Sequence, residues 1–270
     1  MNKNTTTTTT ATATANANAK EESPKVISKE TVHRLIKDIK QIAENPLTDN
    51  DIYYIHDDED LLKGYAMIVG PADTPYFGGY YFFEIQYPTD YPHSPPLVKY
   101  CTNGDNIRFN PNLYINGKVC VSLLNTWRGE QWTSCQSIST ILLTLCTLLC
   151  KDPLLNEPGV TMGHVDLQKY TKIIEYKNID VAILRMIQKH EEYFPIAFDA
   201  FYPYMKEHFF KNSAAIMLHL EQKVKEHCIY INAPNQKITT SMYNLNVVVN
   251  YSVLNDMFIN THDELKNSMK

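Results

Sequence analysis

Large apolar residues are almost absent from the first part of this chain and then begin to recur every three or four positions. Residues 1–25 consist mainly of Thr, Ala and Asn. Such a segment cannot bury enough surface to offset the entropy of ordering its backbone, which predicts a disordered low-complexity tail. The helical periodicity that follows predicts an amphipathic helix over 31–44, with Ser28 as its cap and Asn45-Pro46 as its end. Its apolar positions are Val32, Leu35, Ile36, Ile39 and Ile42.

Three short runs with the composition of β-strands follow this helix. They cover residues 63–69, 80–87 and 97–100, and the turn-forming segment 70–75 separates the first two. Prolines are frequent over 87–96, which excludes regular structure there and predicts a rigid, extended crossing. We therefore expect an antiparallel meander after the first helix.

The rest of the chain begins with a long irregular stretch over 101–132 and continues with helical patterns. A stretch of that length inside a compact domain usually means a functional loop. The apolar run at 138–150 contains several Ser and Thr residues. It is too short and too polar to cross a bilayer, and it indicates a buried helix. Helical patterns then recur at 167–192, 196–210 and 213–227.

Composition narrows the class of protein. The chain has 270 residues, of which 44% are hydrophobic and 20% charged, enough for one sizeable core plus an extension. A formal net charge of -5 argues against a nucleic-acid partner, because such binding needs clustered Lys and Arg. Six cysteines without a CxxC pair, and a start without a basic and then apolar signal segment, favour a reducing cytoplasmic or nuclear location and no membrane.

The motifs that carry chemistry gather in the irregular stretch and around it. Asn-Pro-Asn at 110–112 precedes Asn-Gly-Lys-Val-Cys at 116–120, so that the Cys follows the second Asn by eight positions. Tyr-Pro-His-Ser-Pro-Pro lies upstream at 91–96. Trp-Thr-Ser at 132–134 and Asn-Glu-Pro-Gly at 156–159 lie downstream. Several ordered motifs in one chain are far more specific than any one of them alone.

This set of motifs resembles the ubiquitin-conjugating (E2) enzyme family over roughly residues 29–160. Within the family, the Gln-Ser-Ile-Ser helix start at 136–139 and the Asn-Glu-Pro-Gly ending are most similar to the Z branch. The resemblance implies an α+β E2 (UBC) fold, with an N-terminal helix, a four-stranded antiparallel meander, a central helix and a helical C-terminal extension. We accordingly expect the tail at 1–25, a core domain at 26–165 and the extension at 166–270.

The resemblance assigns roles to four residues. Cys120 would carry the cargo as a thioester, because a thiolate both accepts and releases an acyl group near neutral pH. Asn112 would stabilise the oxyanion with its side-chain amide, an effect of roughly 3 kcal/mol. Glu157 would position the incoming lysine, and Ser122 would shape the gate to the cysteine. A solvated surface charge is an equally open interpretation of Glu157, and Asn112 taken alone is typical of a turn.

Two residues depart from the family pattern. Asn110 stands where most E2 enzymes have a His that braces the loop, which leaves the hydrogen bonding of this loop open. His93 stands where E2 enzymes that engage ligases often carry a large apolar residue, and a partly charged imidazole lacks that apolar anchor. Docking of an ordinary E3 ligase is therefore an open point.

The resemblance also implies the partners. An E1 activating enzyme would load Cys120 with ubiquitin or a ubiquitin-like protein, and the acceptor would be a substrate lysine or an E3 ligase. The E1 consumes the ATP, so no metal or bound cofactor is expected. The basic residues of the first helix would steer an acidic E1 surface, or else form an ordinary solvated face. They are Lys29, Arg34, Lys37 and Lys40.

Two other functions are compatible with the same domain. An E2-like scaffold that only binds ubiquitin typically lacks the cysteine, and Cys120 speaks against it. A cysteine hydrolase needs a His base and an orienting Asn or Asp at the thiol. No His is close to Cys120 in the sequence, although distant ones are available to the fold.

Overall fold

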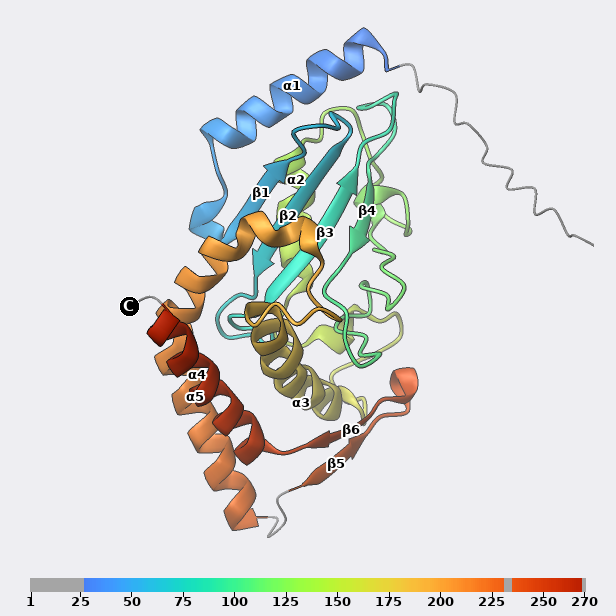
Figure 1. Cartoon of the computed structure of the whole chain (residues 1–270). Coiled ribbons are helices and arrows are strands. Elements are labelled where there is room, and N and C mark those ends of the chain that lie inside the picture. The colour runs from blue at the N-terminus through green and yellow to red at the C-terminus, as the bar shows by residue number, and fades with distance from the viewer. Residues whose placement is uncertain (1–26, 231–234, 269–270) are drawn as a thin grey trace, which may run out of the picture.

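The computed structural model describes residues 27–230 and 235–268 of the chain (Figure 1). The tail predicted at 1–25 lies outside the described residues. The first part of the chain forms α1 (Lys29–Glu44), β1 (Ile52–His56), β2 (Lys63–Val69), β3 (Tyr80–Gln86), β4 (Leu97–Tyr100) and α2 (Ile138–Leu148). Short 3-10 turns lie at η1 (Thr48–Asn50), η2 (Ser122–Leu124) and η3 (Pro153–Asn156). Helix, meander, long loop and buried helix thus follow one another in the predicted order.

Helix α1 begins where the sequence places its cap. The Ser28 hydroxyl accepts the main-chain N–H of Thr31 at 3.0 Å, and Asn45 ends the helix. Thr31 also donates its hydroxyl to the Thr89 carbonyl in the proline-rich crossing, which fastens the start of the helix to the sheet region. The predicted helix is confirmed, although one of its apolar positions, Ile36, is exposed.

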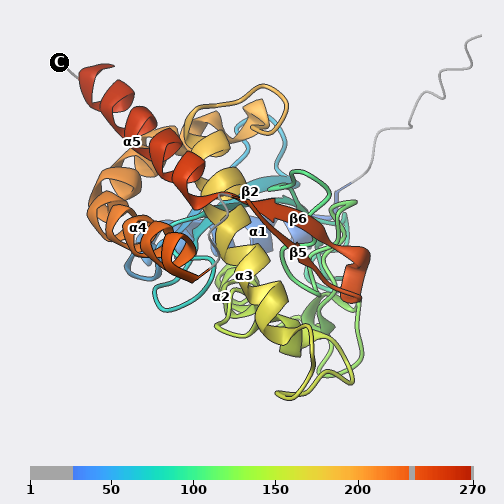
Figure 2. The same ribbon diagram turned by 90° about the horizontal axis from the view of Figure 1, so that it is seen from below.

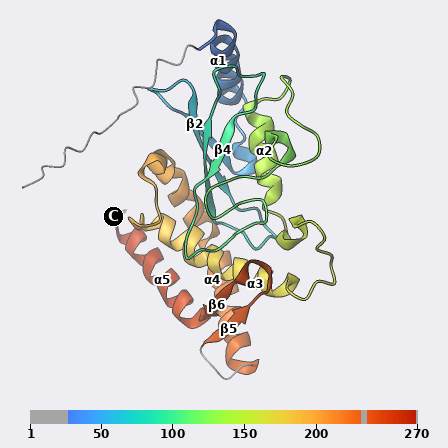
Figure 3. The same cartoon turned by 90° about the vertical axis from the view of Figure 1, so that its right-hand side faces the viewer.

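The four strands form one antiparallel sheet in the order β1-β2-β3-β4. The segments 66–69 of β2 and 80–83 of β3 are buried throughout, and successive side chains of a strand point to opposite faces. Both faces of the sheet are therefore covered, one by α2 and the other by the C-terminal extension (Figure 3). This arrangement confirms the α+β fold class. Strand β1 is the one that the hydrophobic pattern does not mark.

The C-terminal extension is mainly helical, as expected. Helix α3 (Leu167–Lys177) continues as the π-helix η4 (Asn178–Arg185), and the chain then forms η5 (Ile196–Phe201), α4 (Tyr202–Tyr230), β5 (Gln236–Thr239), η6 (Met242–Asn244), β6 (Asn246–Val249) and α5 (Tyr251–Ser268). One predicted detail is wrong, and some elements were not predicted. The helices expected at 196–210 and 213–227 are joined in α4, because no Pro or Gly interrupts the chain between them. The β5–β6 hairpin and α5 carry no pattern that predicted them.

The extension packs onto the sheet and onto itself. Tyr80 of β3 donates its hydroxyl to the Met205 carbonyl at 2.8 Å, and the ring centroids of Phe82 and Phe198 lie 4.8 Å apart. Helices α4 and α5 lie side by side (Figures 1 and 2), and the ring of Phe209 stacks on that of Phe258. The apolar core therefore runs without a break from the sheet into the extension.

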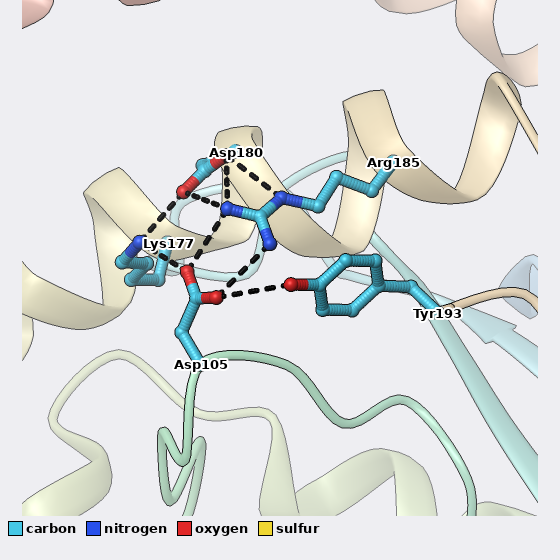
Figure 4. A network of polar contacts seen from close by, with 5 residues as sticks. All are labelled: Asp105, Lys177, Asp180, Arg185 and Tyr193. Carbon is cyan, nitrogen blue, oxygen red and sulfur yellow. Dashed lines mark hydrogen bonds and ion pairs between the residues drawn. The ribbon is translucent and has the colours of Figure 1, made fainter. Parts of the chain in front are cut away.

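A network of charges ties the loop after β4 to α3 and η4 (Figure 4). Asp105 accepts hydrogen bonds from Lys177 at 2.6 Å and from both terminal nitrogens of Arg185 at 3.0 and 2.9 Å. Asp180 accepts from the same two cations, and Tyr193 donates its hydroxyl to Asp105. Burial raises the pKa of Asp105, but the hydrogen bonds from Lys177 and Arg185 outweigh it and hold this pKa below its usual value.

The domain boundary expected between residues 165 and 166 stays a prediction. The charge network and the shared core cross this boundary. Within the described residues, no helix combines the length and the apolarity that a membrane span requires.

Candidate active site

Cys120 lies in the long loop between β4 and α2, directly before η2. Its main-chain N–H donates to the Asn112 carbonyl at 2.9 Å, which fixes its place in the loop. Its thiol donates to the Thr126 carbonyl, with Sγ 3.0 Å from the oxygen. Only 4% of the residue is exposed. The thiol therefore lies beneath a turn of the loop, and access to it depends on that turn.

Asn112 binds the same cysteine through its side chain. Its Nδ2 donates to the main-chain oxygen of Cys120 at 2.6 Å. Its Oδ1 is buried and has no hydrogen-bond partner among the described groups. The amide donor thus lies beside the cysteine but binds its main chain in this state. The role of Asn112 in stabilising an oxyanion stays a prediction.

Asn110 supplies the hydrogen bonds that its departure from the family pattern left open. Its Nδ2 donates to the Leu148 carbonyl at 2.7 Å, at the end of α2, and to the Tyr76 hydroxyl at 3.1 Å. Its Oδ1 accepts the main-chain N–H of Asn112 at 2.9 Å. Tyr76 in turn donates to the Phe109 carbonyl. An amide has both donors and an acceptor, so Asn110 braces the loop against α2 and holds Asn112.

The turn over residues 121–126 covers the thiol. The Thr126 hydroxyl accepts the main-chain N–H of Val121 at 2.9 Å and lies 3.0 Å from the Val119 carbonyl, so this one side chain closes the turn. Ser122 begins η2 in the same turn and is half-buried. Its position agrees with a residue at the entrance to the cysteine, and its role as a gate stays a prediction.

A cavity of about 460 Å³ borders this turn. Val119 and Thr126, which flank the cysteine, line one side of it. The opposite side is formed by the proline-rich crossing and β4, where Leu97 is largely exposed. An open groove therefore lies beside the covered thiol.

Glu157 directly follows η3 and is half-buried. Its Oε2 accepts a short hydrogen bond from the hydroxyl of Tyr243, which belongs to the turn of the β5–β6 hairpin. The neighbouring Asn156 points its Nδ2 toward Asn110 Oδ1 at 3.5 Å. Glu157 is therefore a fixed carboxylate rather than a freely solvated charge. Positioning of a lysine by Glu157 stays a prediction.

The basic residues of α1 divide into two groups. Arg34 is used within the chain, because its Nε donates to Asp38 at 2.9 Å and its terminal nitrogens donate to the carbonyls of Ser134 and Gln136. It fastens α1 to the start of α2, a role that the sequence did not suggest. The side chains of the other three are exposed: Lys29, Lys37 and Lys40.

Burial makes three other cysteines weak nucleophiles. Burial raises the pKa of Cys101 to about 11, and it also raises the pKa of Cys146 and Cys150. A thiol with a raised pKa carries little thiolate at neutral pH and is a weak nucleophile. Over residues 27–230 and 235–268, no group of three or more His, Cys, Asp or Glu is arranged to hold a metal ion.

Three residues of this site escaped the sequence analysis. Thr126 and Arg108 lie in or beside the motif region, but they act through main-chain carbonyls, which no residue pattern reveals. Tyr243 lies more than a hundred positions after the cysteine and outside every motif. No local signal marks it as part of this site.

Comparison with known proteins gives this geometry a context. The family model described as "Ubiquitin-conjugating enzyme" matches residues 34–177, which include Asn112, Cys120 and Glu157. Ubiquitin-conjugating enzyme E2 Z of Xenopus tropicalis is 40% identical over 164 residues, which cover 60% of this chain and 52% of that protein. Ubiquitin-conjugating enzyme E2 Z of Homo sapiens is 41% identical over 158 residues, 57% of this chain and 44% of that protein.

A further relative differs greatly in size. The dual E2 ubiquitin-conjugating enzyme/E3 ubiquitin-protein ligase BIRC6 of Homo sapiens is 34% identical over 196 residues, which cover 67% of this chain and 4% of that protein. The chain spans about half the length of the E2 Z proteins that it matches. The resemblance to the Z branch that the motifs predicted is confirmed.

Proposed function

This chain belongs to the ubiquitin-conjugating enzyme (E2) family, and from that premise we propose that it carries ubiquitin or a ubiquitin-like protein as a thioester on Cys120. The cargo then passes to a lysine or to an E3 ligase. The pairing of Asn112 with Cys120 is the observation that carries the proposal. A side-chain amide and a thiol share one braced loop, and two hydrogen bonds join their residues.

In the first step, the thiolate of Cys120 attacks the carbonyl carbon of the thioester that joins the cargo to the E1. A new C–S bond forms, the C–S bond to the E1 cysteine breaks, and the E1 thiolate leaves and takes up a proton. Thioester exchange is close to isoenergetic, so this chain needs no ATP of its own. The thiol lies under the Thr126 turn, and loading therefore requires this turn to open toward the neighbouring groove.

In the second step, the ammonium of the acceptor lysine first gives up one proton to solvent, and the neutral nitrogen attacks the carbonyl of the thioester on Cys120. The carbonyl oxygen becomes negative, then the C–S bond breaks, Cys120 leaves as a thiolate and the nitrogen loses a proton. In this proposal the amide of Asn112, which lies beside Cys120, stabilises the oxyanion. Glu157 is the fixed carboxylate that draws the lysine ammonium toward the site, and Ser122 shapes the entrance.

The partners follow from the surface of the chain. We propose that the exposed lysines of α1 attract an acidic surface of the E1, since charge complementarity raises association rates. Arg34 is excluded from this role by its bonds to Asp38 and to the start of α2. At the neighbouring ligase position, the exposed His93 lies with Nε2 3.2 Å from Glu30 Oε1. An E3 that docks here meets a polar pair, not an apolar anchor.

A cysteine hydrolase is the rival with a different chemistry. Such an enzyme holds a His ring against its thiol. In the described part of this chain, the hydrogen bond of the Cys120 thiol goes to a main-chain carbonyl, with no His in contact with the sulfur. The loop therefore lacks the base that hydrolysis by this route requires.

The decisive experiment incubates the protein with an E1, ATP and ubiquitin and compares reducing with non-reducing gels. We expect an E1-dependent adduct that a thiol reagent releases from the wild type. Cys120→Ser should give at most an adduct that resists the reagent. Cys135→Ser, which changes an exposed cysteine of the same loop, is the matched control and should load normally. A thiol-sensitive adduct that survives in Cys120→Ser, or release of ubiquitin from a conjugate without E1 and ATP, contradicts the proposal.

A further inference from the structure

The turn of the β5–β6 hairpin lies against the candidate active site. Figure 1 shows the hairpin beside α3, at the end of the core where the long loops gather. From this turn, Tyr243 donates its hydroxyl to Glu157 Oε2. One carboxylate oxygen of Glu157 is thereby occupied, and the carboxylate is held in one orientation. A residue of the extension thus touches a residue proposed to position the acceptor.

The same side chain touches the loop that carries Asn112. The ring centroid of Tyr243 lies 4.4 Å from Arg108 Cζ, and the ring centroid of Tyr114 lies 3.8 Å from the same atom. Arg108 also donates to the Pro111 carbonyl, directly before Asn112. The guanidinium is therefore clamped between two aromatic rings, an arrangement that stabilises a cation. Tyr243 therefore contacts both Glu157 and the loop that carries Asn112.

The turn is anchored independently of these contacts. Asp166, which is almost fully buried, accepts three hydrogen bonds at Oδ2, from the Ser241 N–H and hydroxyl and from the Met242 N–H at 3.0 Å. Burial raises the pKa of Asp166, but these hydrogen bonds outweigh it and hold the pKa below its usual value. Asp166, directly before α3, thus holds the hairpin turn in place.

The backbone at Tyr243 is strained. Its φ is 60° and that of Asn244 is 51°, in the left-handed region that a bulky side chain seldom adopts. Strain of this kind persists only where the surroundings over-determine the conformation, and it is concentrated at functional sites. The anchored turn imposes this conformation, and the conformation directs the Tyr243 ring at Arg108 and its hydroxyl at Glu157.

We propose that Tyr243 is a positioning residue for aminolysis, which acts through Glu157 and through the clamped Arg108. The inference rests on the proposed function. The Tyr243 hydroxyl holds Oε2, so that Oε1 is the oxygen left to receive the lysine ammonium, and the ring keeps Arg108 and the Asn112 loop in place. The C-terminal extension then forms one wall of the acceptor side of the site rather than a remote appendage.

The test measures discharge of the loaded full-length chain onto free lysine over a range of lysine concentrations. Tyr243→Phe removes the hydroxyl and keeps the ring, and we expect roughly a tenfold loss in the second-order rate, the size that one hydrogen bond to a charged group supports. The discharge rate should therefore rise less steeply with lysine concentration than it does in the wild type. Loading by the E1 should be unchanged. Asp166→Asn, which frees the turn but keeps Tyr243 and Glu157, should reproduce the defect.

Two comparisons separate positioning from mere stability. Tyr202→Phe removes a similar hydroxyl bond, to the Ile187 carbonyl, elsewhere in the extension and should discharge like the wild type. In a Glu157→Ala background, Tyr243→Phe should cause no further loss, because its partner is gone. Wild-type discharge by Tyr243→Phe, or an undiminished effect of it in Glu157→Ala, overturns the inference. Absence of any thioester in the wild type instead overturns the proposed function.

Discussion

The side-chain Nδ2 of Asn112 lies 2.6 Å from the main-chain oxygen of Cys120, eight residues further along the chain. The cysteine returns a bond of its own, from its N–H to the Asn112 carbonyl at 2.9 Å. Two hydrogen bonds therefore join the two residues. The amide thus binds the main chain of the cysteine, and the oxyanion role proposed for it needs the second N–H of the same amide or a rotation of the side chain.

Replacement of Asn112 tests this double role. Asn112→Ala removes the donor, and we expect loading at Cys120 to persist while discharge onto lysine slows by roughly a hundredfold, as for the loss of one oxyanion donor. Single-turnover discharge of the purified thioester is the measurement. The comparison is Asn110→Ala, which keeps the Asn112 side chain but removes the hydrogen bond that holds its main chain. Equal discharge by Asn112→Ala and the wild type would remove the oxyanion role.

Access to the thiol depends on the Thr126 turn. Thr126→Val keeps the shape of the side chain but removes the hydroxyl that binds Val121 and Val119. We expect Cys120 to react several-fold faster with iodoacetamide, because the turn opens more often, and the free energy of unfolding to fall by about 1 kcal/mol. Thr171→Val removes a hydroxyl bond to the Leu167 carbonyl in α3 and serves as control. An unchanged alkylation rate would show that the turn does not limit access.

Burial gives Cys101 a distinctive pH dependence. Its pKa is raised to about 11, so at pH 8, three units lower, roughly one thiol in a thousand is ionised. Alkylation of Cys101, followed by mass spectrometry, should rise about tenfold per pH unit from pH 7 to 10, whereas in urea-unfolded protein it should level off near pH 9. A folded pKa above the unfolded value also means that this group costs stability as the pH rises from about 8.5 to 11. If the alkylation rate of Cys101 in the folded protein levels off near pH 9, its pKa is not raised.

The charge network of Figure 4 should contribute strongly to stability. In Asp180→Ala, the largely buried Lys177 keeps only Asp105 as a partner and shares it with Arg185. We therefore expect the free energy of unfolding, measured with urea, to fall by about 3 kcal/mol. Asp199→Ala breaks the exposed pair with Lys189 and should cost less than about 1 kcal/mol. Equal effects of the two substitutions would show that the network acts only as a set of surface pairs.

The sequence by itself determined the elements whose signals lie in consecutive residues. Ser28 and the spacing after it mark α1, runs with the composition of β-strands mark three of the four strands, and the prolines of 87–96 mark the crossing. The string that ends at Cys120 identified the family, because its residue types and spacing are local properties of the chain. Capping, periodicity and turn chemistry act over a few residues, which is why they can be read without the fold.

Only the tertiary structure decided how distant residues are used. Arg34 is bound to the start of α2 about a hundred positions away, and Tyr243 reaches Glu157 from a hairpin that no pattern predicted. The burial of Cys120 and the brace formed by Asn110 also depend on packing between separate segments. Contacts of this kind arise when elements pack against one another, and they leave no periodic trace in the sequence, since either partner alone looks like an ordinary surface residue.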